Sequence, residues 1–508
     1  MLAFGDIHEQ GFFERLQNSF KDSYATIFSD TSKPRTIVVV PSLTLDHEIL
    51  SKVRGHCYYE ERMLCMLMLL KMPRTKLIFV SSLPISPLII DYYLHMLPGI
   101  TGSHAKSRLH LLSCYDAGDT PLTEKLLNRP RLLQRIKQLI DTESPAHLVF
   151  FNVTEAEQKL SVALQIPMYG CPPELNYLGT KSGSRNVFEE ATVRMPFGKT
   201  DLHSKQDVLM ALSEIYQHDT QVKKAVVKLN EGFSGDGNAI FSYEGITTDN
   251  TSLWIAENLE RQLRIVAEDM SYDQYMKKMS LMGGIAEMFI TGEDVRSPSV
   301  QCRINPLGEI SILSTHDQML GGVNNQVFLG ACFPASASYA SDLAKIGYKI
   351  AEILRDKGVL GRFGIDFMSV RTDSGWEHYA IEINLRKGGT THPYLMLQFL
   401  TEGNYYEKEG LYRVQNGSPR YYYATDNLQN PAYCGLTPPD LIEIAMNHGL
   451  HYDHTKEEGI MFHLISALSQ YGKIGLVSIG KSPDAARRFY QKVVEVLAQE
   501  TENQARLV

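Results

Sequence analysis

The sequence predicts a protein of mixed α/β and α+β class that contains several domains. In the first third of the chain, short apolar runs rich in β-branched residues alternate with helix-like patterns, which is typical of a mainly parallel sheet covered by helices. From about residue 170 onward, candidate strands are instead paired through glycine-containing turns, which indicates antiparallel hairpins. The chain has 508 residues, and this length suits about three or four domains or subdomains.

The elements of the first third follow from its apolar runs. Three runs predict buried strands: TIVVV (36–40), KLIFVSS (76–82) and HLVFF (147–151). Residues 48–70 and 122–140 between them have helical patterns. No G-x-G-x-x-G follows the first strand, and G-x-x-x-x-G-K-[ST] is absent from the chain, so this third has no nucleotide-binding fingerprint of those kinds. Its polar cluster HCYYEE is more typical of a helix surface than of an active site.

The remaining two thirds predict hairpins, a linker and a final small unit. Residues after 400 are rich in tyrosine and are expected to form an irregular linker, and a small α/β unit follows from about 437. The expected elements are strand 225–229 paired with 238–243, strand 364–370 paired with 378–385, helices 204–216 and 252–265, and in the last unit strand 473–479 and helix 483–498.

Composition narrows the possible functions. Fifty Lys and Arg residues against 58 Asp and Glu give a net charge of −8, whereas nucleic-acid binders usually carry a basic excess. The seven cysteines are widely spaced without C-x-x-C, which indicates a reducing compartment. Asp6 and Glu9 occupy the place of the basic start of a signal peptide, and the apolar stretch 63–70 is much shorter than the roughly 20 residues of a membrane span. We therefore expect a cytoplasmic protein without nucleic-acid or membrane partners.

The strongest motif is GIDFMSVRTDSGWEHYAIEINLRKGG (364–389). If this hairpin is symmetric, Asp366 lies opposite Glu382, and strand alternation places Glu382, Asn384 and Arg386 on one face. Carboxylates directly opposite each other on a sheet are destabilising unless a cation offsets them. A divalent metal with oxygen ligands, such as Mg²⁺ bridging nucleotide phosphates, suits this set. A merely solvated hairpin would instead show scattered polar residues.

Two further motifs suit a nucleotide. AVVKLNEGFSGDGNAIFSY (225–243) is a hairpin whose glycines allow backbone N–H groups to approach a phosphate, with Lys228 in the entering strand. A protein kinase also has a Gly-rich hairpin, but the H-R-D, D-F-G and A-P-E motifs are absent from the chain. GIAEMFITGEDVRSPSVQCRI (284–304) is a strand that ends at Ile290 and a turn that presents Glu293. This segment could offer backbone hydrogen bonds to adenine and a carboxylate to ribose. Taken alone, it equally suits an ordinary pair of strands joined by a turn.

In this order, the three motifs resemble the ATP-grasp fold, in which ATP lies between two α+β subdomains, one with a Gly-rich lid and the other with an acidic metal hairpin. The resemblance implies two cofactors, ATP and Mg²⁺, the latter as two ions held by Asp366, Glu382 and Asn384. LGTKSGSRNVFEEA (178–191) resembles the entry segment of this fold, in which Lys181, with Arg185 as second choice, contacts phosphate. The implied ATP-binding residues are Lys181, Lys228, Gly235, Gly237, Glu287, Phe289, Ile290 and Glu293.

The resemblance narrows to the peptide-ligase group typified by the pheganomycin peptide ligase. The motifs that carry it are YEERML (59–64), FLGACFPA (328–335), EINLRKGGTTHPY (382–394) and FHLISALSQYGKIGLVSIGKSP (462–483). A related region occurs in an animal IQ-motif protein, although we find no IQ motif in this chain. The implied domains are a pre-ATP-grasp α/β domain (1–165), an ATP-grasp domain (166–400, with the lid at about 186–283), a linker (401–436) and a C-terminal α/β domain (437–508).

The resemblance implies an ATP-dependent carboxylate–amine ligase that forms an amide or peptide bond through an acyl phosphate and releases ADP and phosphate. Its substrates would be an amino acid or a short peptide, and the catalytic residues Arg386, Lys228 and Arg303. The implied substrate-binding residues are Gly388, Gly389, Thr390 and His316. Arg303, which follows Arg296 on the strand after the hinge, suits a salt bridge better than a phosphate or substrate contact, and Arg362 is a weaker candidate. His316, Asp317 and Gln318 equally suit a substrate contact, a base for the amine or an ordinary hydrogen-bonded loop.

Two alternatives stay open. One is another ATP-grasp enzyme, a carboxylase or a phosphotransferase, although nothing in the sequence suggests a biotin attachment site. The other is a catalytically silent ATP-binding regulatory protein, against which the intact set of Asp366, Glu382 and Asn384 argues. A homodimer is expected only because two-fold symmetry is the commonest arrangement of soluble oligomers.

Overall fold

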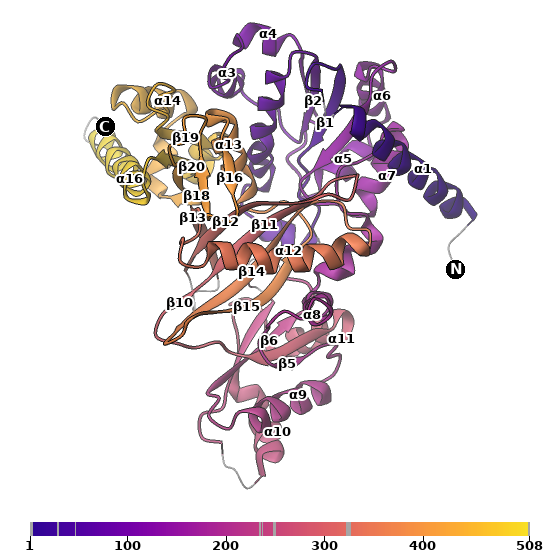
Figure 1. Cartoon of the computed structure of the whole chain (residues 1–508), viewed down its shortest axis with the longest axis vertical. Helices are drawn as coiled ribbons and strands as arrows, with labels where there is room; N and C mark the ends of the chain where they lie inside the picture. Colours follow the sequence, from indigo (N-terminus) through magenta and orange to yellow (C-terminus); the bar gives the residue numbers. More distant parts are fainter. Residues whose placement is uncertain are drawn as a thin grey trace.

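The structure is a computed structural model that describes residues 4–505 apart from 28–29, 46, 233–234, 236, 247–249 and 322–326. Three sheets follow one another along its long axis (Figure 1). A parallel sheet with helices lies at one end, a large antiparallel sheet lies in the middle and continues into the C-terminal part, and a smaller antiparallel sheet lies at the other end. Within the described residues, no helix is both long and apolar enough to cross a membrane.

The N-terminal sheet is parallel, in the order β3-β2-β1-β4, as the alternation of strands and helices predicts. The valines of β1 are fully buried because both faces of the sheet are covered. The strands are β1 (Arg35–Val40), β2 (Thr75–Ser81), β3 (Leu109–Ser113) and β4 (Ala146–Phe150). The helices are α1 (Phe4–Ile27), α2 (His47–Lys52), η1 (His56–Lys71), α3 (Pro87–His95), α4 (Gly102–Lys106), α5 (Leu122–Leu127), α6 (Pro130–Leu139) and α7 (Glu155–Leu164).

Two helices predicted in this part are interrupted. Between α2 and η1, Gly55 adopts a left-handed conformation with φ of 72°, and the chain continues as a 3₁₀-helix. The prediction of one helix over 48–70 was therefore wrong. The helix predicted at 122–140 is divided into α5 and α6, because the residue before Pro130 disfavours helical backbone.

The smaller sheet, which we call the lid sheet, has the order β5-β9-β6-β7-β8. The predicted pairing of 225–229 with 238–243 is confirmed by the antiparallel ladder between β6 and β7. The strands are β5 (Gly198–Lys199), β6 (Lys224–Leu229), β7 (Asn238–Ser242), β8 (Leu263–Ile265) and β9 (Gly284–Met288). The helices around it are α9 (Lys205–His218), α10 (Thr251–Gln262) and α11 (Tyr272–Met282). The two preceding helices, η2 (Pro173–Gly179) and α8 (Lys181–Glu190), pack into the core of the large sheet instead.

The large sheet has the order β10-β14-β11-β12-β13-β18-β20-β19, with β15 paired to β14. Its strands are β10 (Val295–Arg296), β11 (Pro298–Ile304), β12 (Ile310–Gly321), β13 (Val327–Phe333), β14 (Gly361–Thr372), β15 (Gly375–Asn384), β18 (Tyr421–Gln429), β19 (Gly459–His463) and β20 (Lys473–Gly480). A separate hairpin pairs β16 (Asn404–Tyr406) with β17 (Leu411–Arg413). The helices are α12 (Ala340–Asp356), α13 (Thr391–Thr401), η5 (Pro431–Gly435), α14 (Pro438–Asn447), η6 (Ile465–Ala467), α15 (Leu468–Tyr471) and α16 (Pro483–Ala505).

Part of the segment expected to be an irregular linker is instead a central strand. Within residues 401–436, β18 pairs with β13 on one side and with β20 on the other. Tyr422 is buried and stacks on Phe333, with ring centroids 4.8 Å apart. Aromatic residues favour strands, so the tyrosine run supports a sheet position rather than a loop. As a result, the C-terminal part continues the large sheet.

The hydrophobic core shows which parts pack together. One continuous cluster of buried side chains joins the N-terminal sheet to α13 and to the C-terminal strands, through residues such as Leu67, Leu397 and Leu476. The lid sheet has a core of its own, which includes Phe241 and Tyr275. The lid is therefore packed as a separate unit, whereas the N-terminal and C-terminal parts share a core.

Candidate active site

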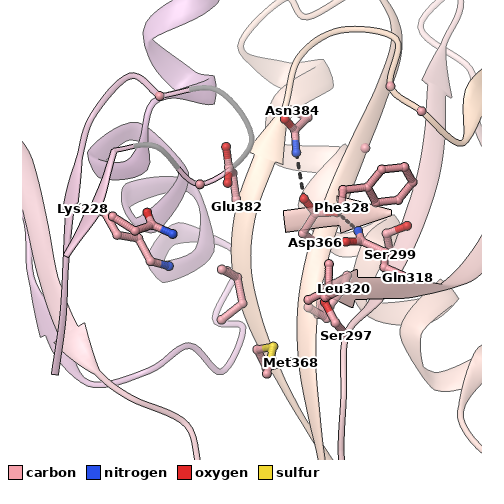
Figure 2. Close-up of a pocket in the computed structure, with 18 of the residues that line it drawn as sticks. Lys228, Ser297, Ser299, Gln318, Leu320, Phe328, Asp366, Met368, Glu382 and Asn384 are labelled. Carbon is pink, nitrogen blue, oxygen red and sulfur yellow. Dashed lines mark hydrogen bonds between the residues drawn. The ribbon is translucent and has the colours of Figure 1, made fainter. Parts of the chain in front are cut away.

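A cavity of about 440 Å³ lies between the lid sheet and the large sheet. Figure 2 shows its two walls, with Lys228 of the lid on one side and Asp366 of the large sheet on the other. Ligand pockets commonly measure about 300–1,000 Å³, so this volume suits a small molecule of nucleotide size. The predicted site residues that line it are Lys181, Lys228, Gly235, Gly237, Glu287, Phe289, Ile290, Asp366, Glu382, Asn384, Arg386, Gly388, Gly389 and Thr390.

The acidic hairpin has the predicted pair, because Asp366 of β14 lies directly opposite Glu382 of β15. The hairpin is not symmetric, however: Thr372 pairs with Gly375 at the turn, and a β-bulge next to Asp366 shifts the register to bring the two carboxylates together. Asn384 donates from Nδ2 to Asp366 Oδ2 at 2.9 Å, and Gln318 of β12 donates from Nε2 to Asp366 Oδ1 at 2.6 Å (Figure 2). Burial, and then the charge of Glu382, raise the pKa of Asp366 to about 6. The carboxylates therefore form a compact acidic face, and Gln318 orients Asp366.

Lys181 lies at the start of α8 and reaches across to this acidic face. Its Nζ lies 2.6 Å from Glu382 Oε1, and both side chains are largely buried. Burial raises the pKa of Glu382, but the neighbouring charges of Lys181, Lys228 and Arg386 lower it overall, below its ordinary value. Lys181 thus supplies a positive charge directly beside a carboxylate that is predicted to bind metal.

The lid wall is organised by a second buried carboxylate. Glu287 of β9 contacts Lys228 Nζ through Oε1 and Arg185 Nη1 through Oε2, the latter at 2.9 Å. All three side chains are less than one-tenth exposed. Glu287 therefore holds Lys228 at the cavity and Arg185 behind it. Arg185 does not line the cavity, whereas Lys181 does.

We expect Glu287→Gln to destabilise the protein by about 3 kcal/mol, because it leaves two buried cations without a counter-charge. Urea unfolding followed by circular dichroism measures this loss. The control is Glu214→Gln on the same lid, whose pair with Lys199 is nearly half exposed at both side chains. Exposed pairs contribute about 0–1 kcal/mol. Equal losses in the two variants would contradict the role given to Glu287.

The Gly-rich loop lies over the cavity. Gly232, Gly235 and Gly237 line it, while Phe233, Ser234 and Asp236 of the same motif lie outside the described residues. Gly235 has a φ of 90°, which favours glycine. A Cβ at Gly237 would lie 3.3 Å from the Cβ of Leu229, so the two sides of the loop approach each other closely.

The segment after β15 forms the end of the cavity nearest the N-terminal domain. Gly388, Gly389 and Thr390 line it directly beyond the acidic face. Lys387, directly before Gly388, is buried and contacts the carbonyl oxygen of Phe150 at the end of β4. The N-terminal sheet thereby fixes the loop that carries these three residues.

Three predicted residues are not brought to the cavity. His316 is fully buried, and its Nε2 lies 2.6 Å from the hydroxyl of Tyr422. Burial lowers the pKa of His316 to about 3, so it is neutral and poorly suited as a base. Arg303 lies opposite Arg362 in the register of β11 and β14, and its Nη2 contacts Ser311 Oγ at 3.4 Å. Glu293 is exposed in the turn after β9. None of the three lines the cavity.

The other candidates have structural partners. Asp317 lies on the opposite face from Gln318 and accepts hydrogen bonds from the hydroxyl of Tyr339 at 2.5 Å and from the backbone N–H of Ser336 at 2.9 Å. Arg296 pairs with Asp294 at 2.7 Å. The ion pair on this segment is therefore at Arg296, whereas the side chain of Arg303, for which a salt bridge was expected as an alternative, contacts Ser311.

The cavity also has walls that the sequence motifs did not predict. Tyr59, Arg62 and Phe151 come from the N-terminal domain, and Asp426 and Asn427 come from β18. The guanidinium of Arg62 lies over the rings of Tyr59 and Phe151, at 4.7 and 4.5 Å from their centroids. The motif YEERML contains Tyr59 and Arg62, but no site role was predicted for them. The contribution of β18 was hidden because its segment was expected to be a linker.

Comparisons with known proteins agree with this architecture. A family described as "IQCH-like, ATP-grasp" matches residues 173–264 and 254–406, and one described as "PGM1 C-terminal domain" matches residues 440–493. The L-propargylglycine--L-glutamate ligase of Streptantibioticus cattleyicolor is 27% identical over 469 residues, which cover 90% of this chain and 93% of that protein. IQ motif-containing protein H of Danio rerio is 23% identical over 403 residues, which cover 70% of this chain but 38% of that protein.

Solved structures share the fold. The biotin carboxylase domain of Hydrogenobacter thermophilus 2-oxoglutarate carboxylase, solved with MgADP, ADP and bicarbonate, superposes with a TM-score of 0.52 at 14% identity, covering 91% of this chain and 89% of that one. The ADP complex of purK, N5-carboxyaminoimidazole ribonucleotide synthetase, gives a TM-score of 0.51 at 13% identity, covering 93% and 98%. The chain therefore has the ATP-grasp fold, and its residues 173–406 match an ATP-grasp family.

Proposed function

We propose that the protein is an ATP-dependent carboxylate–amine ligase that joins amino acids or short peptides. The observation that carries the proposal is the continuity of one cavity, in which the acidic face of Asp366 and Glu382 adjoins the loop 388–390. A nucleotide at the acidic face and a carboxylate at the loop would therefore meet in the same space. The similarity to a ligase of two amino acids, over nine-tenths of both chains, supports the choice of substrates.

The residues present suit Mg²⁺ and ATP. Asp366, Glu382 and Asn384 offer oxygen atoms, the ligands that Mg²⁺ prefers. Because Asn384 donates from its nitrogen to Asp366, its side-chain oxygen is the atom left for a metal. When bound, Mg²⁺ would offset the charge of the β- and γ-phosphates. We propose two ions, and equilibrium dialysis of the protein with ATP and Mg²⁺ measures their number.

The lysines have carboxylate partners that phosphates can replace. Lys181 pairs with Glu382 and Lys228 with Glu287. We propose that both lysines turn to the α- and β-phosphates when ATP binds, which frees Glu382 as a metal ligand. Each lysine then keeps a negative partner in both states, so no buried charge is left unpaired. The Gly-rich loop supplies backbone N–H groups to the same phosphates.

The reaction follows from this placement. A carboxylate oxygen of the acid attacks the γ-phosphorus. The bond between this phosphorus and the oxygen that bridges the β- and γ-phosphorus atoms breaks, and ADP leaves. Arg386, next to both carboxylates of the acidic face, stabilises the charge on the transferring phosphoryl group. The nitrogen of the amine then attacks the acyl carbon, phosphate leaves, and the amine loses a proton to give the amide. Closure of the separately packed lid excludes water from the acyl phosphate.

We assign the loop 388–390 to the acyl group, and its two glycines provide a test. A Cβ at Gly389 would lie 2.8 Å from the ring of Phe328, which also lines the cavity, whereas a Cβ at Gly388 meets nothing within 4 Å. Overpacking typically costs about 1–3 kcal/mol. We expect Gly389→Ala to lower kcat/KM for the acid about tenfold or more and Gly388→Ala to change it much less. The reverse order would place the acid elsewhere.

The function itself is tested by product analysis. The purified protein is incubated with ATP and Mg²⁺ and with pairs drawn from the amino acids and from short peptides. We expect ADP to be released only with a competent acid and amine, and mass spectrometry to find the condensed product. ADP release with an acid alone and no new amide would indicate a phosphotransferase. Tight ATP binding without turnover for any pair would indicate a regulatory protein.

A further inference from the structure

Three buried ligand groups meet at the edge of the cavity, on the side away from the lid. They are His392 at the start of α13, Asp426 of β18 and His463 at the end of β19. Their side chains are at most about one-tenth exposed, and they come from positions far apart in the sequence. The acidic face described above uses none of them. Among the described residues, no other group of three or more His, Cys, Asp or Glu side chains converges in this way.

The three ligand atoms form a small triangle. His392 Nε2 lies 3.0 Å from Asp426 Oδ1, His463 Nε2 lies 2.7 Å from the same oxygen, and the two Nε2 atoms lie 3.0 Å apart. A point beside this triangle lies at about 2.0–2.1 Å from all three atoms, the usual distance from zinc to a histidine nitrogen or a carboxylate oxygen. Tetrahedral ligands at this distance from zinc lie about 3.3 Å apart, so the three atoms hold an ion once they move outward by a few tenths of an ångström.

Hydrogen bonds hold this triangle only in a crowded arrangement. Asp426 Oδ2 faces Arg62 Nη1 at 3.4 Å, so Oδ1 is the oxygen that faces both imidazoles. If both Nε2 atoms carry hydrogen, both donate to this one oxygen while the two nitrogens lie only 3.0 Å apart; if one does not, its lone pair faces the carboxylate oxygen. A divalent cation beside the triangle relieves this crowding, because all three atoms then act as ligands.

The surroundings hold the three ligand side chains in place next to the cavity. His463 lies opposite Gly475 in the ladder of β19 and β20, and a Cβ at Gly475 would lie 2.1 Å from His463 Nε2. Only glycine at position 475 leaves space for the imidazole in this core. Asp426 lines the cavity together with Arg62, so the triangle adjoins the cavity on that side. Three protein ligands next to a cavity are typical of metal sites that keep a position for water or substrate.

We propose that His392, Asp426 and His463 form a second metal site, specific for a divalent transition ion of the Zn²⁺ type and distinct from the Mg²⁺ face. Two imidazoles and one carboxylate favour such an ion over Mg²⁺, which prefers an all-oxygen set. The site joins α13, β18 and β19. It therefore links the loop after the acidic hairpin to the C-terminal part of the large sheet.

The test measures metal directly. The full chain is purified without a histidine tag, stripped with chelator and titrated with Co²⁺ in the presence of saturating Mg²⁺ and ATP. We expect one equivalent to bind, with visible absorption bands of a low-coordinate Co²⁺ site, and one equivalent of Zn²⁺ to displace it. The metal content after dialysis against Zn²⁺ is read by mass spectrometry. A wild-type chain that binds less than about a tenth of an equivalent, with no bands, would overturn the proposal.

Variants assign the site. His463→Gln and His392→Gln should each weaken Co²⁺ binding by at least about tenfold, the effect that even an outer partner of a metal ligand produces. The control His448→Gln, whose pair with Glu500 is about one-third exposed, should bind one equivalent. The double variant Asp366→Asn with Glu382→Gln should also bind one equivalent of Co²⁺. If this double variant bound none, Co²⁺ would be placed at the acidic face instead. Far-ultraviolet circular dichroism of each variant separates a lost ligand from a lost fold, and binding that survives in both folded histidine variants would contradict the assignment.

Discussion

Replacing Asp366 with Asn should lower kcat of the ligase by about 10³-fold. Asp366 is buried at the centre of the acidic face, accepts hydrogen bonds from Gln318 and Asn384, and lies opposite Glu382. The substitution preserves its size but removes the charge that would hold Mg²⁺ against the phosphates. Losing a single electrostatic group at a reacting centre costs about 10²–10³ in rate, and a metal ligand belongs at the upper end of that range.

The matched control for this variant is Asp373→Asn. Asp373 lies in the exposed turn of the same hairpin, so the substitution makes the same chemical change at a distance from the cavity. Steady-state ADP release with saturating substrates compares the two variants. If Asp366→Asn retained more than about a tenth of the activity, the metal assignment would be wrong.

Replacing Arg386 with Lys should reduce kcat by about 10²-fold or more and leave KM for ATP nearly unchanged. Arg386 follows the metal strand and lines the cavity between the acidic face and the loop 388–390. Lysine keeps the charge but loses the planar fork that binds two phosphate oxygens at once. An interaction made only in the transition state lowers kcat rather than raising KM.

Arg371→Lys is the matched control for Arg386. Arg371 lies near the tip of the same hairpin, where its guanidinium is 5.5 Å from the ring of Trp376, and it is exposed. The variant Arg371→Lys should have the kcat and KM of the wild type. If Arg386→Lys raised KM for ATP and left kcat unchanged, Arg386 would bind the nucleotide equally in the ground state and in the transition state. It would then not act on the transferring phosphoryl group.

The sequence was most informative where a local pattern determines the geometry. Strand alternation and a short turn predicted Asp366 opposite Glu382, and the structure has this pair, although a β-bulge next to Asp366 that the sequence did not predict produces it. The glycines of the lid hairpin likewise predicted a loop over the cavity. Both predictions concern residues close together in the chain. The period of a strand alone, counted from the turn, would nevertheless place Asp366 opposite Ile381.

Residues whose positions depend on distant packing could not be predicted in this way. His316 shares a strand with Gln318, but Tyr422 of β18 covers it, and that strand pairs with β13 from nearly a hundred residues further along the chain. The cavity walls from Arg62 and Asp426 have the same cause, since no local pattern brings η1 next to β18. Breaks in helices were missed for a different reason: Gly55 and Pro130 interrupt patterns that are otherwise helical.

The central claim is that the acid is activated by phosphoryl transfer from ATP, and an isotope measurement tests it most directly. Once the assay has identified a competent acid, its carboxylate is labelled with ¹⁸O and the protein is given ATP, Mg²⁺ and the amine. The mechanism predicts that one labelled oxygen passes from the acid to each phosphate released, because that oxygen bridges carbon and phosphorus in the acyl phosphate. Unlabelled phosphate beside a fully labelled amide, or AMP and pyrophosphate as products, would contradict the account.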